Sequence, residues 1–277
     1  MRAAAPAHPR PASPVLLAAS LWRYRAFIGS LVARDFRGRY LRTALGGFWA
    51  LAQPLVMVLL YLLVFSELMR ARLPGSGDAL AYGLFLCGGL LPWTFFSEVL
   101  IRCQGVFVEH GDLLKKSAFP RSALPVYAAL SAALNFGLAT GVFLAVAAAA
   151  GRWPGRAVAA WLPLALLLGL LGMALGVILG TLHVYLRDVA HATAVALQVG
   201  FWLTPIVYPV EALPEAVRPW IARNPLAPLV GAFQQVVLRG DWPAWASLAP
   251  LGLAALVSAG AAYLLFRRLG AEMADVL

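Results

Sequence analysis

Long runs of apolar residues dominate the chain, and short charged stretches separate them. Six runs approach or exceed the roughly 20 residues that a helix needs to cross the hydrocarbon core of a membrane. The predicted crossings cover residues 44–66, 79–101, 123–150, 157–186, 189–207 and 243–266. Stretches such as LPLALLLGLLGMALGVILG are apolar on every helical face, whereas the strands of a membrane barrel alternate polar with apolar residues. The pattern predicts an all-α integral membrane protein with six transmembrane helices.

Composition and charge agree with this prediction. Of 277 residues, 62% are hydrophobic and 12% are charged, which is too little polarity for a soluble globular protein. A net charge of +10 can indicate nucleic-acid binding, but here the positions of the charges favour a different explanation. Fifteen lysines and arginines fall on the side of the predicted topology that carries both termini, and seven fall on the other side. The bias places both termini in the cytoplasm, so we expect contacts with membrane lipids and no nucleic-acid partner.

Residues 21–43, LWRYRAFIGSLVARDFRGRYLRT, have a pattern unlike that of the crossings. One helical face carries Arg23, Ser30, Arg34 and Arg37. Apolar and aromatic residues form the broad remainder, with Tyr40 near its end, and Asp35 and Arg39 interrupt it. The pattern predicts a basic amphipathic helix in the inner interface, for which membrane anchoring and docking of a partner are both open. Residues 1–20 precede it as a Pro- and Ala-rich tail that we expect to be disordered.

The residues give little sign of catalysis. A P-loop requires the pattern G-x-x-x-x-G-K-[ST], and neither Lys115 nor Lys116 follows a glycine. The four histidines show no H-E-x-x-H spacing, and no G-x-S-x-G elbow occurs. His183, Asp188 and His191 lie close in sequence at the end of a crossing, where polar anchors are more common than a site. We therefore expect no enzymatic activity, metal or cofactor in this chain itself.

Inside the predicted crossings, Glu98 is the single carboxylate, and it precedes Arg102 by one helical turn. This spacing favours a structural ion pair over a proton path. Glycines at G-x-x-x-G spacing are Gly172, Gly176 and Gly180 on the fourth crossing and Gly137 and Gly141 on the third. Such glycines let helices approach closely, either within one subunit or at a dimer contact. Cys87 and Cys103 indicate two buried thiols and no disulfide framework.

Four stretches together carry a resemblance to a known family. They are RDFRGRYLRTALGGFWALAQPL (34–55), LLKKSAFPRSALP (113–125), LRDVAHATAVALQVGFWLTPIVYP (186–209) and NPLAPLVGAFQQVVL (224–238). In this order they resemble the permease subunits of ABC-2 type polysaccharide exporters, also called type V ABC exporters, which export O-antigen, capsule and teichoic acid chains. With the layout of the crossings, the resemblance covers nearly all of the chain after about residue 20.

The resemblance implies a permease of the bacterial inner membrane. Such a permease homodimerises around a channel and exports a lipid-linked polysaccharide, and for this chain we expect O-antigen. Two separate ATPase subunits would bind the ATP and Mg. An exporter of a drug or a lipid is the nearest alternative, and an intramembrane enzyme that acts on lipid-linked sugars is a more distant one.

The resemblance also suggests a role for EHGDLLKKSAFP (109–120), the connection between the second and third crossings. In the family this cytoplasmic connection forms a coupling helix that sits in a cleft of the ATPase. Leu113 and Leu114 would form its apolar contact, and Pro120 would end it. Its charged rim would consist of Asp112, Lys115 and Lys116. A plain solvated loop is the alternative.

The segment 204–233 contains too many prolines for one crossing and is too apolar for a free loop. By resemblance it should form short helices that dip into the outer leaflet, over about 208–240. Aromatic rings stack on the flat faces of sugars, so rings near the second and fifth crossings are candidates for a polymer path. The candidates are Trp93, Phe95, Phe96, Phe201, Trp202 and Tyr208. Anchoring at the membrane interface explains the same residue types equally well.

Overall fold

The computed structural model describes residues 14–41, 45–68, 73, 78–114, 121–270 and 273. Its elements in chain order are α1 (Pro14–Arg23), α2 (Arg25–Phe36), η1 (Arg37–Leu41), α3 (Phe48–Leu62), η2 (Leu63–Leu68), α4 (Ala79–Glu109), α5 (Gly111–Leu114), α6 (Ala123–Ala149), η3 (Gly155–Ala160), α7 (Trp161–Tyr185), α8 (Asp188–Leu203), η4 (Val210–Ala212), α9 (Arg218–Ala222), α10 (Ala227–Arg239) and α11 (Trp245–Leu269). Within these described ranges no residue is in a strand. The prediction of an all-α fold is confirmed.

Five stretches are long and apolar enough to cross a membrane, and they coincide with five of the six predicted crossings. They are Phe48–Phe65, Leu80–Glu109, Ala123–Ala149, Gly155–Tyr185 and Trp245–Leu269. The second runs eight residues beyond its predicted end, because α4 continues as one helix to Glu109. The 31 residues of α4 span about 46 Å, so this helix extends past a hydrocarbon core of roughly 30 Å.

The remaining predicted crossing, 189–207, corresponds to α8, which has 16 residues. At 1.5 Å per residue α8 is about 24 Å long, somewhat short of a full crossing. It ends at Leu203 because Thr204 adopts an extended conformation with φ −100° and ψ 134°. Pro205 follows, and proline disfavours the helical conformation in the residue before it. The count of six crossings therefore stays a prediction.

The N-terminal segment differs from the prediction in two respects. Helix α1 begins at Pro14, inside the segment expected to be a tail, because proline is well suited to a first helical position and the apolar VLLAASLW follows it. Tyr24, with φ −91° and ψ 9°, separates α1 from α2. The predicted helix over 21–43 is thus divided, and it continues as a π-helix in η1. Residues 1–13 and 42–44 lie outside the described ranges.

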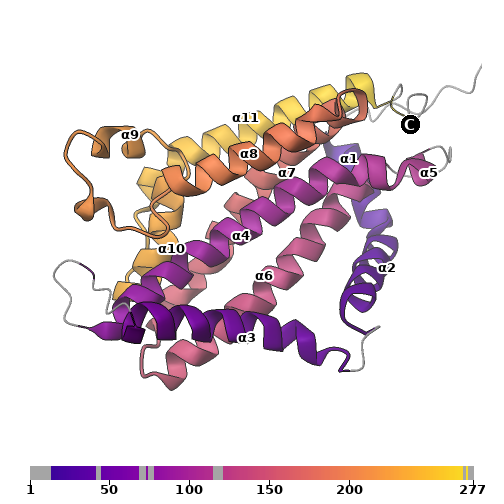
Figure 1. The fold of residues 1–277 in the computed structure, drawn as a ribbon. Coiled ribbons are helices and arrows are strands. Elements are labelled where there is room, and N and C mark those ends of the chain that lie inside the picture. Colours follow the sequence, from indigo (N-terminus) through magenta and orange to yellow (C-terminus); the bar gives the residue numbers. More distant parts are fainter. Residues whose placement is uncertain are drawn as a thin grey trace, which may run out of the picture.

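Helix α4 is the central element and packs against α6, α7 and α10 (Figure 1). Figure 1 shows that α1, α5 and the C-terminal end of α11 lie at one end of the molecule, whereas α9 and α10 lie at the opposite end. We call these the α5 end and the α9 end. This arrangement separates the predicted coupling segment from the predicted outer segment.

Close packing of α4 on α7 depends on the glycines of the fourth predicted crossing. They are Gly172, Gly176 and Gly180. A Cβ atom at Gly176 would lie 2.6 Å from the Cβ of Cys103 and 2.7 Å from the carbonyl oxygen of Leu100. These glycines therefore serve packing within one chain. A Cβ atom at Gly137 or Gly141 of α6 would meet no atom within 4 Å, so a dimer contact stays open for that pair.

An aromatic core centred on Trp161 joins four helices. Its ring stacks against Phe136 and Phe143 of α6, with centroids 6.2 and 6.0 Å apart, and meets Phe233 of α10 edge-on at 5.1 Å. Phe95 of α4 stacks on Phe136 at 4.6 Å. Because offset and edge-to-face ring pairs add to the stabilisation from burial, this core fixes α4, α6, α7 and α10 relative to one another.

Candidate functional site

The predicted coupling segment follows the C-terminal end of α4 directly. After His110, α5 forms a single helical turn, and Asp112 is exposed on it. Outside the described part of the structure lie the side chains of Leu113 and Leu114 and the whole of residues 115–120, with Lys115 and Lys116. Because α4 is longer than a hydrocarbon core is thick, α5 can lie outside the membrane, as a contact with a soluble subunit requires.

At the α5 end, side-chain contacts join the end of α4, the start of α6 and the end of α11. The Nδ1 atom of His110 lies 3.2 Å from the carbonyl oxygen of Val106, and the His110 ring meets the ring of Tyr127 edge-on at 5.8 Å. The guanidinium of Arg121, just before α6, donates to the carbonyl oxygen of Gly270 at the end of α11. The connection from α4 to α6 is thereby joined to the C-terminal end of α11.

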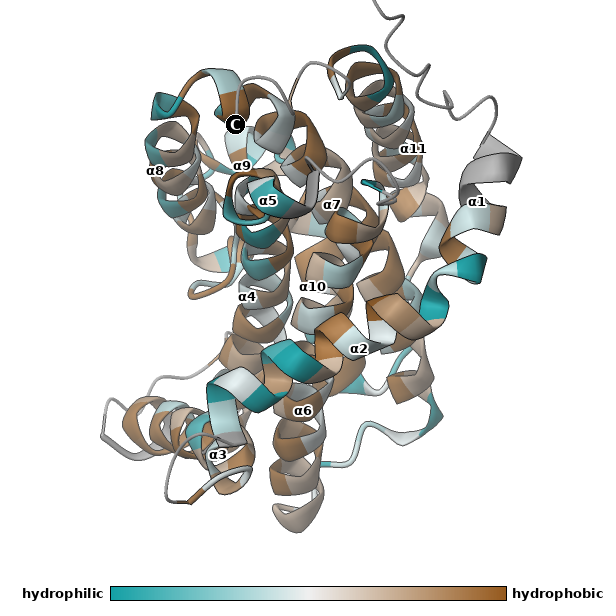
Figure 2. Ribbon diagram, turned by 90° about the vertical axis from the view of Figure 1, so that its right-hand side faces the viewer, coloured by the Kyte–Doolittle hydropathy of each residue, from teal (hydrophilic) through white to brown (hydrophobic). Residues whose placement is uncertain are grey.

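Helix α2 packs on α6 and keeps its polar face outward. Ser30 and Arg34 of the predicted polar face lie on α2, whereas Arg23 ends α1 and Arg37 begins η1, and all four are exposed. Ile28 and Leu31 are buried on the opposite face. Figure 2 shows polar residues along α2 and at α5, while α3 and α6 beside them remain largely apolar. Exposed polar and buried apolar residues thus lie on opposite faces of α2, and an amphipathic interface helix over 21–43 stays a prediction.

Two carboxylates and two arginines from η1, α2 and α4 form what we call the charge cluster. Its members are Asp35, Arg39, Glu98 and Arg102, with Asn135 of α6 as a fifth, neutral member. Arg102 lies 2.9 Å from Oδ2 of Asp35 and 3.0 Å from Oε1 of Glu98, which confirms the predicted pair on α4. Asn135 donates to the same Glu98 oxygen at 2.7 Å. Arg39 is farther away, 3.5 Å from Glu98 and 3.6 Å from Asp35.

The end of α8 leads into an extended segment at the α9 end, where several side chains satisfy its backbone. Tyr82 of α4 donates to the carbonyl oxygen of Val207, and Gln234 of α10 donates to that of Pro205 at 3.1 Å. Asn224 donates to the last carbonyl oxygen of α8 at 3.1 Å. Non-helical backbone is tolerated at membrane depth only where such groups are satisfied. The short helices η4, α9 and α10 follow within 208–240, and their entry into the outer leaflet stays a prediction.

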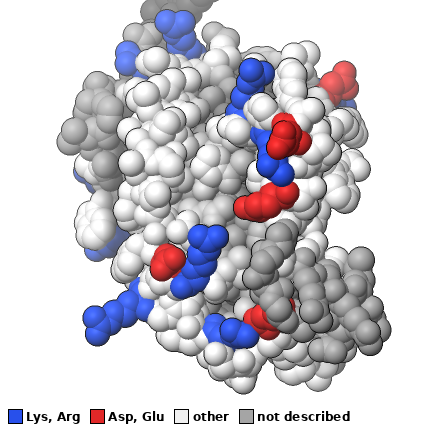
Figure 3. Space-filling model, turned by 90° about the vertical axis from the view of Figure 1, so that its left-hand side faces the viewer, with Lys and Arg blue, Asp and Glu red and all other residues white. Residues whose placement is uncertain are grey.

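Charges of both signs are interspersed at the α9 end, as Figure 3 shows. Arg152, after α6, lies 2.6 Å from Oδ2 of Asp78, and Asp78 also accepts a hydrogen bond from the backbone of Leu80 at the start of α4. Pairing of this kind offsets positive charge at the α9 end, whereas α1, α2 and η1 together expose Arg23, Arg25, Arg34 and Arg37 nearer the α5 end.

The six aromatic path candidates do not form one surface in a single chain. Trp93, Phe95 and Phe96 are buried. Phe201 of α8 meets Trp93 edge-on at 6.0 Å, so α8 is held to α4 by a ring pair. Trp202 is 60% exposed. The Tyr208 hydroxyl donates to the carbonyl oxygen of Trp202 at 2.6 Å, and partial burial raises the pKa of this phenol.

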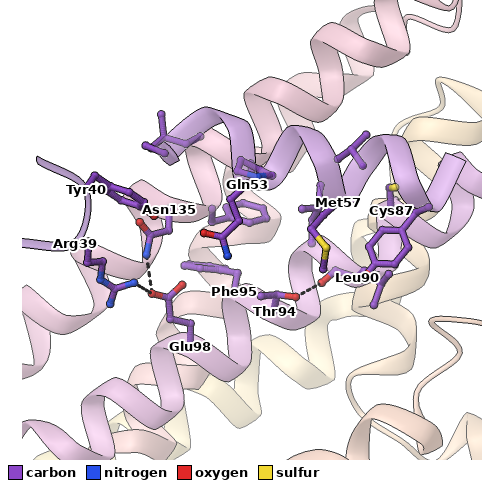
Figure 4. A pocket seen from close by; sticks show the side chains of 18 residues that line it. Arg39, Tyr40, Gln53, Met57, Cys87, Leu90, Thr94, Phe95, Glu98 and Asn135 are labelled. Carbon is purple, nitrogen blue, oxygen red and sulfur yellow. Dashed lines mark hydrogen bonds and ion pairs between the residues drawn. The ribbon is translucent and has the colours of Figure 1, made fainter. Parts of the chain in front are cut away.

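A cavity of about 340 Å³ lies between α3, α4 and α6, and η1 closes one end of it. Figure 4 shows Arg39, Glu98 and Asn135 together at that end. Residues further along its wall include Gln53, Met57, Cys87, Leu90, Leu91, Thr94, Phe95 and Phe136. Among the residues that the structure describes, no group of three or more His, Cys, Asp or Glu side chains could hold a metal ion.

Comparison with known proteins decides the family. The model of the family described as "ABC-2 type transporter" matches residues 27–238. The chain belongs to this family. An O-antigen export system permease protein RfbA of Myxococcus xanthus is 29% identical over 263 residues, which cover 94% of this chain and 99% of the relative. An RfbA of Klebsiella pneumoniae is 27% identical over 75% of this chain and 78% of its own. A polysialic acid transport protein KpsM of Escherichia coli is 24% identical, over 83% of this chain and 88% of the relative.

The region that matches the ABC-2 family contains α5, the charge cluster, the cavity and the extended segment after α8. Sequence reasoning found α5 and the pair on α4 but missed the contacts of Asp35, Arg39 and Asn135. A signal for two of them was present, because Asp35 and Arg39 interrupt the apolar face of α2 and η1 one helical turn apart. Nothing in the pattern pointed to Asn135.

Proposed function

We propose that this ABC-2 chain is the permease subunit of an ATP-driven exporter of a lipid-linked polysaccharide in the bacterial inner membrane. Two copies form the channel, and two separate ATPase subunits bind ATP and Mg and drive transport. The relatives named as permease proteins of O-antigen export and as a polysialic acid transport protein support a polysaccharide cargo. The alignment with one of them runs along almost the whole of both chains.

The observation that carries the proposal is the position of α5. It is a single helical turn at the end of the longest helix, and that helix projects beyond a membrane thickness. Movement of α5 would pass directly into α4, which packs against α6, α7 and α10. The exposed arginines of α2 lie near the same end, which supports a cytoplasmic orientation for it and for both termini.

The motor contact is tested by a double variant, Leu113→Asp with Leu114→Asp. Placing charge in an apolar cleft costs roughly several kcal/mol, so we expect the ATPase subunit to stop co-purifying or to lose transport-coupled hydrolysis. Trp153→Asp is the matched control, because it also replaces an apolar residue by aspartate but lies at the α9 end. Normal assembly and export in the double variant would overturn the coupling role of α5.

The cargo is tested separately by complementation. A strain that lacks its own O-antigen permease should regain surface polymer when this chain and its ATPase are supplied together. Restored efflux of a drug, with no polymer at the surface, would favour the alternative cargo instead.

A further inference from the structure

The last turn of α11 contacts the chain on both sides of the predicted coupling segment. Phe266 stacks on Phe107 of α4, with ring centroids 5.3 Å apart and planes inclined by 23°. One turn later, the carbonyl oxygen of Gly270 accepts a hydrogen bond from the guanidinium of Arg121. Phe107 comes shortly before α5 in the chain, and Arg121 comes just before α6. Movement of the segment between them therefore acts on α11 at two points.

Both contacts are at least partly buried. Phe107 is fully buried, Gly270 is buried and Arg121 is partly buried. Carbonyl groups at the C-terminal end of a helix have no partner within the helix, and an arginine there also meets the negative end of the helix dipole. The bond from Arg121 is therefore charge-assisted, and no backbone donor of α11 replaces it when the guanidinium is removed.

Helix α11 extends from this joint to the other end of the molecule. It has 25 residues, which corresponds to a length of about 37 Å. It begins at Trp245, shortly after α10 ends at Arg239, and Figure 1 shows that it runs from the side of α9 and α10 to the α5 end. It packs along α7, which in turn packs on α4. Because a packed helix moves as a rigid element, displacement of its last turn also displaces its first.

We propose that Arg121 couples the connection between α4 and α6 to α11, so that movement of α5 reaches the α9 end along α11 as well as along α4. The proposal rests on the proposed contact of α5 with an ATPase subunit. Arg121 is then a positioning residue, which touches neither the nucleotide nor the polymer. A cap that only stabilises the end of α11 is the alternative role.

Tyr185 at the end of α7 gives a comparison for that alternative. Its hydroxyl donates to the carbonyl oxygen of Leu269, next to Gly270, at 3.5 Å. Tyr185 thus bonds the same helix end as Arg121 does, but it does not belong to the connection between α4 and α6. Loss of its hydroxyl removes a bond to α11 without removing the link to α5.

A cysteine reporter at the far end of α11 measures the transmission. Trp245→Cys places a thiol at the first residue of α11, where the native side chain is 45% exposed, whereas both natural thiols are buried. In the purified complex with the ATPase subunit, addition of ATP should change the rate at which maleimide labels this reporter. Arg121→Gln should reduce the change about tenfold while the ATPase still co-purifies and hydrolyses ATP, because one charge-assisted hydrogen bond is lost.

Further variants separate coupling from folding. Arg121→Lys should restore most of the response, because a lysine ammonium also donates to a carbonyl oxygen. Phe266→Leu removes the ring stack but keeps Arg121, and it should reduce the response to a smaller extent. Tyr185→Phe and Arg187→Gln are the matched controls, one for the helix end and one for an exposed arginine, and both should respond to ATP as the unaltered protein does.

The outcomes distinguish this proposal from the proposed function. A full response to ATP in folded Arg121→Gln overturns the proposal, and if that variant does not fold, a full response in Phe266→Leu does so. An equal loss in Tyr185→Phe also overturns it, because a structural cap then explains both variants. The proposed function fails by a different result, in which the unaltered chain purifies without an ATPase or the double variant at Leu113 and Leu114 assembles and exports normally. That result would overturn both.

Discussion

Arg102 forms ion pairs with two carboxylates that lie on different helices. Asp35 and Glu98 each lie within about 3 Å of its guanidinium, and the three side chains are between 15% and 23% exposed. Water therefore screens these charges only in part. Removal of the shared cation leaves both acids with Arg39, at 3.6 Å from Asp35 and 3.5 Å from Glu98, as their charged partner in the cluster.

We predict that Arg102→Met lowers the free energy of unfolding by roughly 1–3 kcal/mol, somewhat less than for a fully buried pair. Thermal unfolding of the purified protein in detergent measures the effect, and Arg187→Met, an exposed arginine at the same end, is the control. Addition of Glu98→Gln to Arg102→Met should recover part of the loss, because it removes one of the two acids that then share Arg39. Equal melting temperatures for the Arg102 and Arg187 variants would show that the cluster does not stabilise the fold.

At the scale of residues, the sequence predicts contacts between side chains on the same helix but not contacts between helices. The Glu98 and Arg102 pair follows from a spacing of four residues on one helix. The contact between Asp35 and Arg102 joins residues 67 positions apart, and periodicity gives the face of a helix without naming the helix that it meets. The burial of Trp93 and Phe96 could not be predicted for the same reason, since apolar residues occupy most faces of their helix and none names its partner.

At the scale of elements, the junction of α4 and α7 differs sharply from the exposed face of α6. Helices α6 and α7 carry glycines at the same spacing, so the sequence alone does not distinguish their roles. The structure separates them, because α7 presses its glycines onto backbone atoms of α4 while Gly137 and Gly141 face open space.

We predict opposite signs for one substitution at two of these glycines. Gly176→Ala places a methyl group 2.7 Å from the carbonyl oxygen of Leu100, so α7 must move away from α4 at a cost of roughly 1–3 kcal/mol. Gly141→Ala meets no atom and gains helix propensity, so its stability should stay level or rise by up to about 1 kcal/mol. Melting temperature and yield of folded protein measure both. A melting temperature for Gly176→Ala as high as that of Gly141→Ala would contradict the packing described for α7.

Element boundaries also show where sequence reasoning falls short. Five crossings could be located because an apolar run of about 20 residues is itself enough to indicate a membrane-spanning helix. The end of α8 at Leu203 was predicted four residues too late, since an apolar run does not register the effect of Pro205 on Thr204. The start of α1 at Pro14 was missed because alanine and proline on either side suggested a tail.

At the scale of the whole molecule, the α5 end and the α9 end should face opposite sides of the membrane. Cysteine reporters test this directly, and the two natural cysteines give little background because Cys87 is 1% and Cys103 is 0% exposed. We predict that an impermeant maleimide labels Trp153→Cys in intact cells but labels Asp112→Cys only after the membrane is opened. Labelling of Asp112→Cys from outside would invert the topology, and it would exclude an ATPase contact at α5.

The path of the polymer is a property of the assembled molecule. The candidate rings for it divide into buried rings, such as Trp93, and exposed rings, such as Trp202. Trp93 is 8% exposed and packs against Phe96 and Phe201, so Trp93→Ala should destabilise the fold by about 3–5 kcal/mol and lower export through loss of folded protein. Trp202 is 60% exposed at the end of α8, where a second copy or a polymer can reach it. Trp202→Ala should therefore keep the melting temperature yet lower export, since each lost stacking contact costs roughly 1 kcal/mol. Export of labelled polymer, normalised to folded complex, measures the difference. Full export by Trp202→Ala would assign this ring to interface anchoring, the role that tryptophan fills at many membrane surfaces.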